Sequence, residues 1–60
     1  MIDNAVLHYY PLSPWIAKAE VNLRAGNKIV MRAVLRDDET GKRFLRERFA
    51  DIPYRVIVHA

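Results

Sequence analysis

The stretch from Ala17 to Arg24, AKAEVNLR, alternates strictly between apolar residues and polar or charged ones. Successive side chains of a β-strand point to opposite faces of its sheet, so this alternation predicts a strand with one buried face and one solvated face. An amphipathic helix would instead repeat its apolar residues every three to four positions. The chain must therefore contain a half-buried sheet.

Three further segments predict strands. Residues Ala5 to Tyr10 and Lys28 to Arg36 are rich in β-branched, aromatic and other apolar side chains. Tyr54 to His59 follows Pro53, a residue that a strand tolerates at its first position. Neither a repeat nor a linker is visible, so residues 1–60 form a single small domain. We expect an all-β protein, a small antiparallel meander of four to five strands that forms an SH3-like barrel or a curled sheet.

The segment at about residues 42–51 fits two structures. Its apolar residues approach the spacing of a helical stripe, which leaves an α+β fold with a helix at about 42–51 as the alternative: Phe44, Leu45, Phe49 and Ile52. However, Gly41 is a poor first-turn residue, and Arg43 stands where a capping box would need Glu. The sequence Glu39-Thr40-Gly41 favours a hairpin loop with Gly41 in the left-handed region, so a strand is the preferred interpretation.

Register decides which side chains of the first hairpin share a face. A three-residue loop, Ala25 to Asn27, pairs only apolar residues on one face and sets Glu20 opposite Arg32 on the other. A two-residue loop of Gly26 and Asn27 would set Val21 opposite Arg32, which is less favourable. The sequence therefore predicts the three-residue loop.

A second hairpin around Gly41 extends this register and gathers positive charge on one side of a three-stranded sheet. Lys18 lies on that side, and Val30 and Val34 lie among the cations. The candidate nucleic-acid-binding residues are Arg24, Lys28, Arg32, Arg36, Phe44, Arg46 and Arg48. This surface depends on the strand interpretation, because a helix after Gly41 would remove the arginines that the second hairpin contributes.

Catalysis and metal binding are not expected. The chain has no cysteine, so thiolate zinc sites are excluded, and His8 and His59 lie near opposite ends of the sequence. Ser13 and Thr40 have no base at a spacing that suggests an activated nucleophile. The acidic residues 37–39 fit a turn better than a cation site, which needs more oxygen ligands. We expect neither an enzyme nor a cofactor.

The net charge of +3 permits a polyanionic partner. We expect a nucleic-acid-binding protein with little sequence specificity, in which cations contact phosphates and Phe44 stacks on a base or wedges into a step. The alternative is a small interaction module, such as a phage- or plasmid-type inhibitor, that docks on an acidic protein surface.

The remaining aromatic residues and the two termini bear on assembly and location. Trp15, Tyr9 and Tyr10 are expected in the core or in a homodimer contact. The opening residues lack a basic region ahead of an apolar run, so no signal peptide is expected. No apolar stretch approaches the roughly 20 residues of a membrane helix. We expect a soluble, cytoplasmic protein.

One stretch resembles a known family. Arg36, Asp37, Asp38, Glu39, Thr40, Gly41, Lys42, Arg43 and Phe44, followed by Asp51 and Pro53, are similar to a hairpin of the small crenarchaeal chromatin proteins with an SH3-like barrel. The resemblance covers about a third of the chain. It implies a small barrel that lies in the DNA minor groove and bends the duplex.

Overall fold

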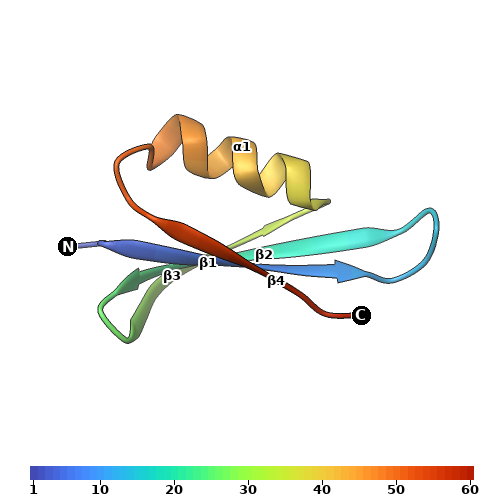
Figure 1. Cartoon of the computed structure of the whole chain (residues 1–60), viewed down its shortest axis with the longest axis horizontal. Helices are drawn as coiled ribbons and strands as arrows, with labels where there is room; N and C mark the ends of the chain where they lie inside the picture. Colours follow the sequence, from blue (N-terminus) through green and yellow to red (C-terminus); the bar gives the residue numbers. More distant parts are fainter.

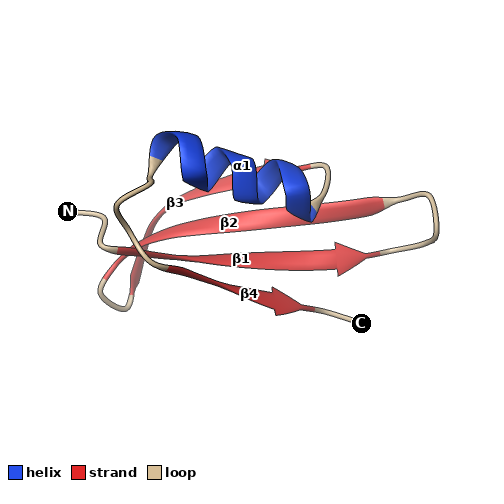
Figure 2. Ribbon diagram, turned by 45° about the horizontal axis from the view of Figure 1, so that its top comes forward, coloured by secondary structure: helices blue, strands red, loops and turns tan.

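The computed structural model describes residues 1–60 as a four-stranded sheet with one helix packed on one face (Figure 1). The elements are β1 (Asn4–Pro11), β2 (Ala17–Ala25), β3 (Lys28–Leu35), α1 (Asp38–Arg48) and β4 (Tyr54–Val58). The strands lie in the order β3-β2-β1-β4, so β3 and β4 form the two edges. Figure 2 shows α1 above the sheet on the β3 and β2 side, with β4 at the far edge.

The four predicted strands are confirmed, but the predicted meander and barrel are wrong. β1, β2 and β3 pair antiparallel in sequence order, whereas β4 crosses back and pairs with β1 in parallel. A parallel partner needs a crossover connection, and α1 provides it. The sheet stays open at both edges, so the fold is the α+β alternative. The barrel that the family resemblance implies is therefore absent.

The β2–β3 hairpin has the two-residue loop that the sequence disfavoured. Ala25 pairs with Lys28, and Gly26 has a φ of 62°, the left-handed region that a type II′ turn needs at its first loop position. A bulge at Val30 then shifts the register by one, so that Val21 lies opposite Ala33. From Met31 to Leu35 the predicted faces are confirmed, because the register there differs from the predicted one by two positions; before the bulge Lys28 and Ile29 lie on the faces opposite to those predicted.

The predicted strand after Gly41 is wrong, because a helix begins three residues before that glycine. Asp37 is extended, with φ −159° and ψ 176°, and caps the helix. Its Oδ1 accepts a hydrogen bond from the Thr40 N–H at 2.8 Å and another from the Thr40 hydroxyl at 2.6 Å. Acidic residues in the first turn and arginines in the last turn complement the helix dipole. The helix therefore starts from Asp37, and not from Thr40, the residue with which a Glu at position 43 would form a capping box.

The core lies between α1 and the centre of the sheet. Its buried members are small or aliphatic: Ala5, Leu7, Ala19, Val21, Leu23 and Leu45. On α1 only Gly41 and Leu45 are buried; the rings of Phe44 and of the C-cap residue Phe49 are partly exposed and lie tilted to each other at 51°, with their centroids 5.8 Å apart. A Cβ on Gly41 would lie 2.7 Å from Leu7 Cδ1, so this glycine lets the helix approach the sheet closely. The single helix, with 11 residues and many charged side chains, is too short and too polar to span a membrane.

The Asp37 cap predicts a loss of stability at low pH. Hydrogen bonds from the Thr40 hydroxyl and then the Thr40 N–H lower the pKa of Asp37 below its ordinary value of 3.8. The unfolded chain therefore binds this proton first as the pH falls. The stabilisation is complete above pH 3.8 and is lost as the pH falls through the folded pKa.

The matched variants are Asp37→Asn, which keeps an acceptor without a titrating charge, and Asp37→Ala, which has no cap. Urea unfolding followed by circular dichroism between about pH 5 and pH 2 should show a smaller loss for Asp37→Asn than for the unmodified chain. Asp37→Ala should lower the Tm by about 4–8 °C at neutral pH. Equal acid sensitivity of the asparagine variant and the unmodified chain would show that this cap does not titrate.

Candidate nucleic-acid interface

One face of the sheet is packed under α1, and the other carries no covering element (Figure 1). We call the second face the open face. Alternation and the strand pairings place on it a fixed set of side chains: Asn4, Val6, His8, Tyr10, Lys18, Glu20, Asn22, Arg24, Ile29, Arg32, Val34, Arg55, Ile57 and His59. Four of these are permanent cations and one is a carboxylate, so the open face is basic.

The single carboxylate of the open face is already engaged. Glu20 Oε2 accepts a hydrogen bond from Asn22 Nδ2 at 2.8 Å and lies 3.9 Å from Arg32 Nε. The Arg32 side chain is nevertheless 66% exposed, so it remains accessible to a ligand. This diagonal pair replaces the predicted direct one, because Arg32 lies opposite Asn22 and Glu20 lies opposite Val34.

An aromatic and imidazole cluster occupies the end of the open face near the β1–β2 loop. The rings of Tyr10 and His59 stack at 4.4 Å with an interplanar angle of 12°, and Lys18 Nζ lies 5.0 Å from the centre of the Tyr10 ring. His8 Nδ1 lies 2.9 Å from His59 Nε2, so one of these nitrogens donates and the other accepts. The cluster joins β1, β2 and the residue after β4 into a platform of flat rings beside a cation.

The centre of the open face is buried, although no helix covers it. Val6 is only 4% exposed, although no element covers it. Its direct neighbours across the strands are Asn22 and Arg55, and the stem of an arginine can cover apolar surface while its charged end stays in water. Arg24 is half-buried, and its Nε is buried without a hydrogen-bond partner. The open face therefore combines a buried centre with cations that reach the solvent.

The predicted surface is wrong in its second half. Phe44, Arg46 and Arg48 lie on α1, and α1 covers the opposite face of the sheet. Phe44 packs against the core, with the Arg48 guanidinium 5.8 Å from its ring centre. The cause is the helix itself, since a 3.6-residue period spreads the arginines around a cylinder whereas a strand would align them. These residues are not part of the open face.

The first half of the prediction survives in part. Arg24 and Arg32 share the open face with Lys18, as the alternation of β2 and β3 predicted. Lys28 pairs with Ala25 at the hairpin turn, on the other side of the sheet from Arg24. Arg36 follows β3 and lies 3.8 Å from Asp37 in an ion pair. Two of the seven candidate residues are therefore brought together.

Four contributors to the open face were missed: His8, Tyr10, Arg55 and His59. Alternation along β1 predicts that His8 and Tyr10 share a face, and alternation along β4 predicts the same for Arg55 and His59. What it does not contain is the pairing of β4 with β1, which brings the two histidines together from distant parts of the sequence.

These features define a small α+β protein with a half-covered, mixed four-stranded sheet and a basic open face that includes stacked rings. Comparison of the chain with protein-family models, with curated proteins and with solved structures finds no match. The function therefore has to be argued from the surface itself.

Proposed function

We propose that this protein binds nucleic acid, without catalysis and with little sequence specificity, on the open face of its sheet. The observation that carries the proposal is the excess of cations on a sheet face that no helix covers and that also holds the Tyr10–His59 stack. Cations supply sequence-independent attraction to phosphates, and flat rings supply stacking surface for bases. Glu20, the one acid, is paired with Arg32 and adds little repulsion.

The shape of the open face favours a single strand over a duplex. Four strands spaced about 4.8 Å apart make a backbone sheet about 14 Å wide before side chains are added. The major groove of B-DNA is about 12 Å wide, so the sheet cannot enter it lying flat. A single strand can instead lie across the sheet with its bases splayed onto the surface, as nucleic acids do on other exposed four-stranded sheets.

The test is a fluorescence anisotropy titration with a labelled oligothymidine and with a duplex of equal length, over a range of salt concentrations. If all four cations contact phosphates of a single strand, log K should fall against log salt with a slope of about −3. Arg32→Glu combined with Arg55→Glu removes two of these contacts, so the slope should fall to about −1.4 and binding should weaken at all salt concentrations.

The matched control is Arg43→Glu combined with Arg46→Glu. Both arginines are exposed on α1, so the change in net charge is the same but lies on the other side of the sheet. This variant should keep most of the affinity and the slope. Equal losses in the two double variants, or no binding of either oligonucleotide at low salt, would contradict the proposal.

A second candidate function, docking on another protein, is favoured by the β1–β2 loop. Trp15 is 90% exposed, and Leu12 and Ile16 are also exposed. The loop is nevertheless ordered, because the Ser13 hydroxyl accepts hydrogen bonds from the N–H groups of Trp15 and Ile16 at 3.2 and 3.0 Å. A rigidly presented tryptophan is typical of protein contact sites. Binding that depends on Trp15 and is insensitive to salt would favour this function.

A further inference from the structure

β4 leaves a row of backbone hydrogen-bonding groups open to solvent. The Pro53 carbonyl accepts from the Ala5 N–H at 3.1 Å, and the His59 N–H donates to the Tyr9 carbonyl at 2.8 Å. Backbone groups alternate in direction along a strand, so the odd-numbered residues of β4 bond to β1. The N–H and C=O groups of Tyr54, Val56 and Val58 therefore point away from the sheet, at its free edge.

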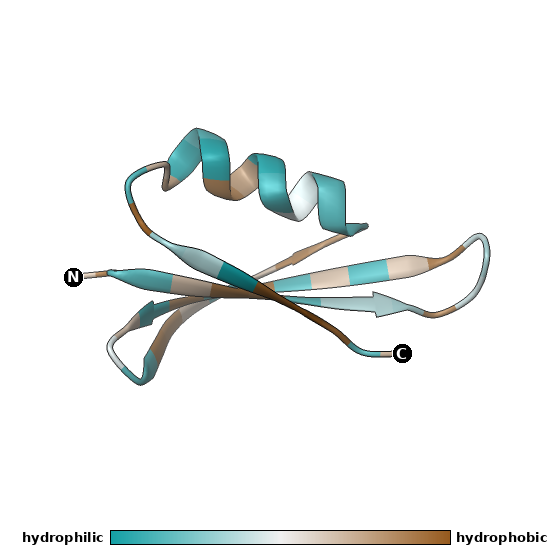
Figure 3. Ribbon diagram, viewed as in Figure 1, coloured by the Kyte–Doolittle hydropathy of each residue, from teal (hydrophilic) through white to brown (hydrophobic).

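The side chains of the same three residues form an uncovered apolar row. They lie on the helix side of the sheet, because Tyr54 and Val56 pair with Ala5 and Leu7 of the core. The backbone of α1 lies close to β1, β2 and β3 but not to β4. Tyr54, Val56 and Val58 are consequently 38%, 39% and 61% exposed. Figure 3 shows the second half of β4 as a continuous apolar segment.

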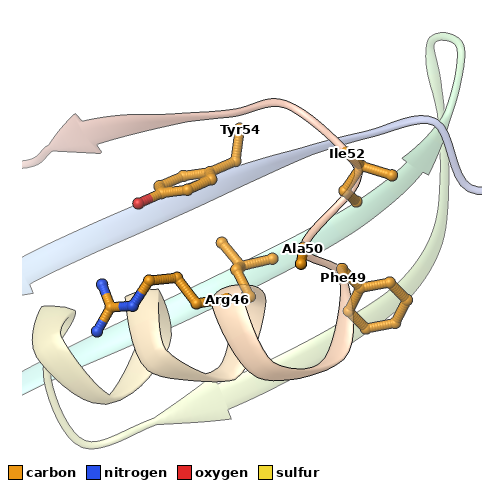
Figure 4. A pocket seen from close by; sticks show the side chains of 6 residues that line it. Arg46, Phe49, Ala50, Ile52 and Tyr54 are labelled. Atoms are coloured by element: carbon orange, nitrogen blue, oxygen red, sulfur yellow. The ribbon is translucent and has the colours of Figure 1, made fainter.

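The space between α1 and β4 is an open hollow (Figure 4). It is lined by Leu45, Arg46, Phe49, Ala50, Ile52 and Tyr54. In the close-up, Tyr54 and Arg46 lie on opposite sides of this hollow, and Ile52 and Phe49 lie at its end. Nothing in the chain fills the gap beside β4, so both the edge and the apolar row of this strand are left without a partner.

We propose that β4 pairs antiparallel with β4 of a second copy of this chain about a two-fold axis. The self-complementary register places Val56 against Val56 of the second copy and Tyr54 against Val58. This register lets all the outward N–H and C=O groups of β4 bond to one another, and it uses the full length of the strand. On the open face it sets Arg55 opposite Ile57 of the second copy.

The neighbouring registers are less favourable. A shift of one residue would bring outward backbone groups against residues whose groups point to β1, so the ladder could not form. A shift of two residues toward the start of β4 would set Arg55 directly opposite Arg55 of the second copy, and like charges in that position are destabilising. A shift of two in the other direction would leave Tyr54 beyond the end of the partner strand. Charge and strand length therefore select one pairing.

The other edge of the sheet is less suited to pairing. β3 contains the bulge at Val30, which bends the strand and interrupts a regular ladder. It also carries Lys28 and Arg32, and charged side chains on an edge oppose the approach of another strand. β4 has no bulge and no internal proline, and Arg55 is its only charged residue. The pairing edge is accordingly β4.

The resulting dimer would have one continuous sheet in the order β3-β2-β1-β4-β4-β1-β2-β3. A two-fold axis perpendicular to a sheet keeps both helices on the same side. The two open faces would therefore join on the other side, with the two copies of Arg55 near the centre. Val56 lies on the helix side of the sheet, so dimerisation can be tested at this residue without changing the open face.

The first test is the mass in solution by sedimentation velocity over a concentration series. A chain of 7.0 kDa should sediment as a dimer of 14.0 kDa. Val56→Lys places two charges against each other at the axis and should give a monomer with an unchanged circular dichroism spectrum. Val34→Lys is the matched control, since Val34 is 66% exposed on the opposite edge strand, and this variant should remain dimeric. A monomeric unmodified chain, or dimers lost only in Val34→Lys, would overturn the proposal.

The second test does not depend on whether Val56→Lys folds, and it reads the register directly. The chain has no cysteine, so single cysteines can be introduced without a background. Paired residues in a hydrogen-bonded position have Cα atoms about 5.5 Å apart, a distance that a disulfide can span. Val56→Cys should form a disulfide-linked dimer under mild oxidation, whereas Val58→Cys should not, because Val58 faces Tyr54. Equal crosslinking at both positions would contradict this pairing.

Discussion

Replacement of Leu45 by alanine is expected to cost about 3 kcal/mol of unfolding free energy. Leu45 is 1% exposed and is the only large side chain of α1 that is fully buried against the sheet. Its truncation removes apolar contacts and leaves a cavity where the helix meets β1 and β2. A domain of this length has a total stability of roughly 3–9 kcal/mol, so the variant should lose about a third of that stability or more.

The measurement is urea unfolding by far-ultraviolet circular dichroism at a fixed protein concentration. Arg46→Ala is the control, because Arg46 is exposed on the same helix and alanine preserves helix propensity. The control should unfold at nearly the same urea concentration as the unmodified chain. If Leu45→Ala changes the unfolding free energy by less than about 1 kcal/mol, Leu45 does not anchor the helix.

The second large effect is expected at Gly41. A Cβ there would lie 2.7 Å from Leu7 Cδ1 and 3.6 Å from Val21 Cγ2, and both of these residues are fully buried. Gly41→Val adds two further methyl groups to this contact, so α1 must lift from the sheet or the core must rearrange. Overpacking of this kind typically costs about 1–3 kcal/mol, and we expect a value at the upper end.

Two companion variants separate packing from helix propensity. Arg43→Val introduces the same β-branched residue on an exposed position of α1, so its small effect measures propensity alone. Gly41→Ala gains up to about 1 kcal/mol of propensity but keeps the close Cβ contact, and it should fall between the two valine variants. A Gly41→Val variant no less stable than Arg43→Val, by urea unfolding, would contradict the close approach.

The strands could be predicted from the sequence because their signal is local. The alternation from Ala17 to Arg24 is a property of consecutive residues, and it assigns faces without any knowledge of partners. The exact register of β2 and β3 could not be predicted from this local pattern. From Met31 to Leu35, a two-residue turn followed by a bulge at Val30 yields the same faces as a longer loop, so the alternation of these residues does not distinguish the two pairings.

The helix was not the preferred prediction because its cap is Asp37, three residues before Thr40, where a capping box with position 43 would begin. Asp37 has the capping geometry, and Thr40, rather than a glutamate, occupies the position that completes the bond. Gly41 predicts a hairpin turn because glycine readily adopts the left-handed region and is a poor residue for the first turn of a helix. Its actual role depends on Leu7, a residue far away in the sequence, and no local pattern can reveal such a contact.

The candidate site could likewise be predicted from the sequence only in part. Arg24 and Arg32 follow from alternation, whereas the contact between His8 and His59 follows from the topology. The pairing of β4 with β1 is a long-range contact that depends on the whole sheet and on the crossover through α1. The sequence alone therefore predicts which residues of a strand share a face but not which strands are neighbours.

The parallel pairing of β1 and β4 has a consequence for the order of assembly. β1, β2 and β3 are joined by short turns, so they can associate at a small entropic cost, while β4 must wait for the crossover through α1. Until β4 docks, the outer edge of β1 is bare, and the late strand of a neighbouring molecule fits it equally well. This topology therefore allows exchange of β4 between two molecules, and a high protein concentration would favour such exchange.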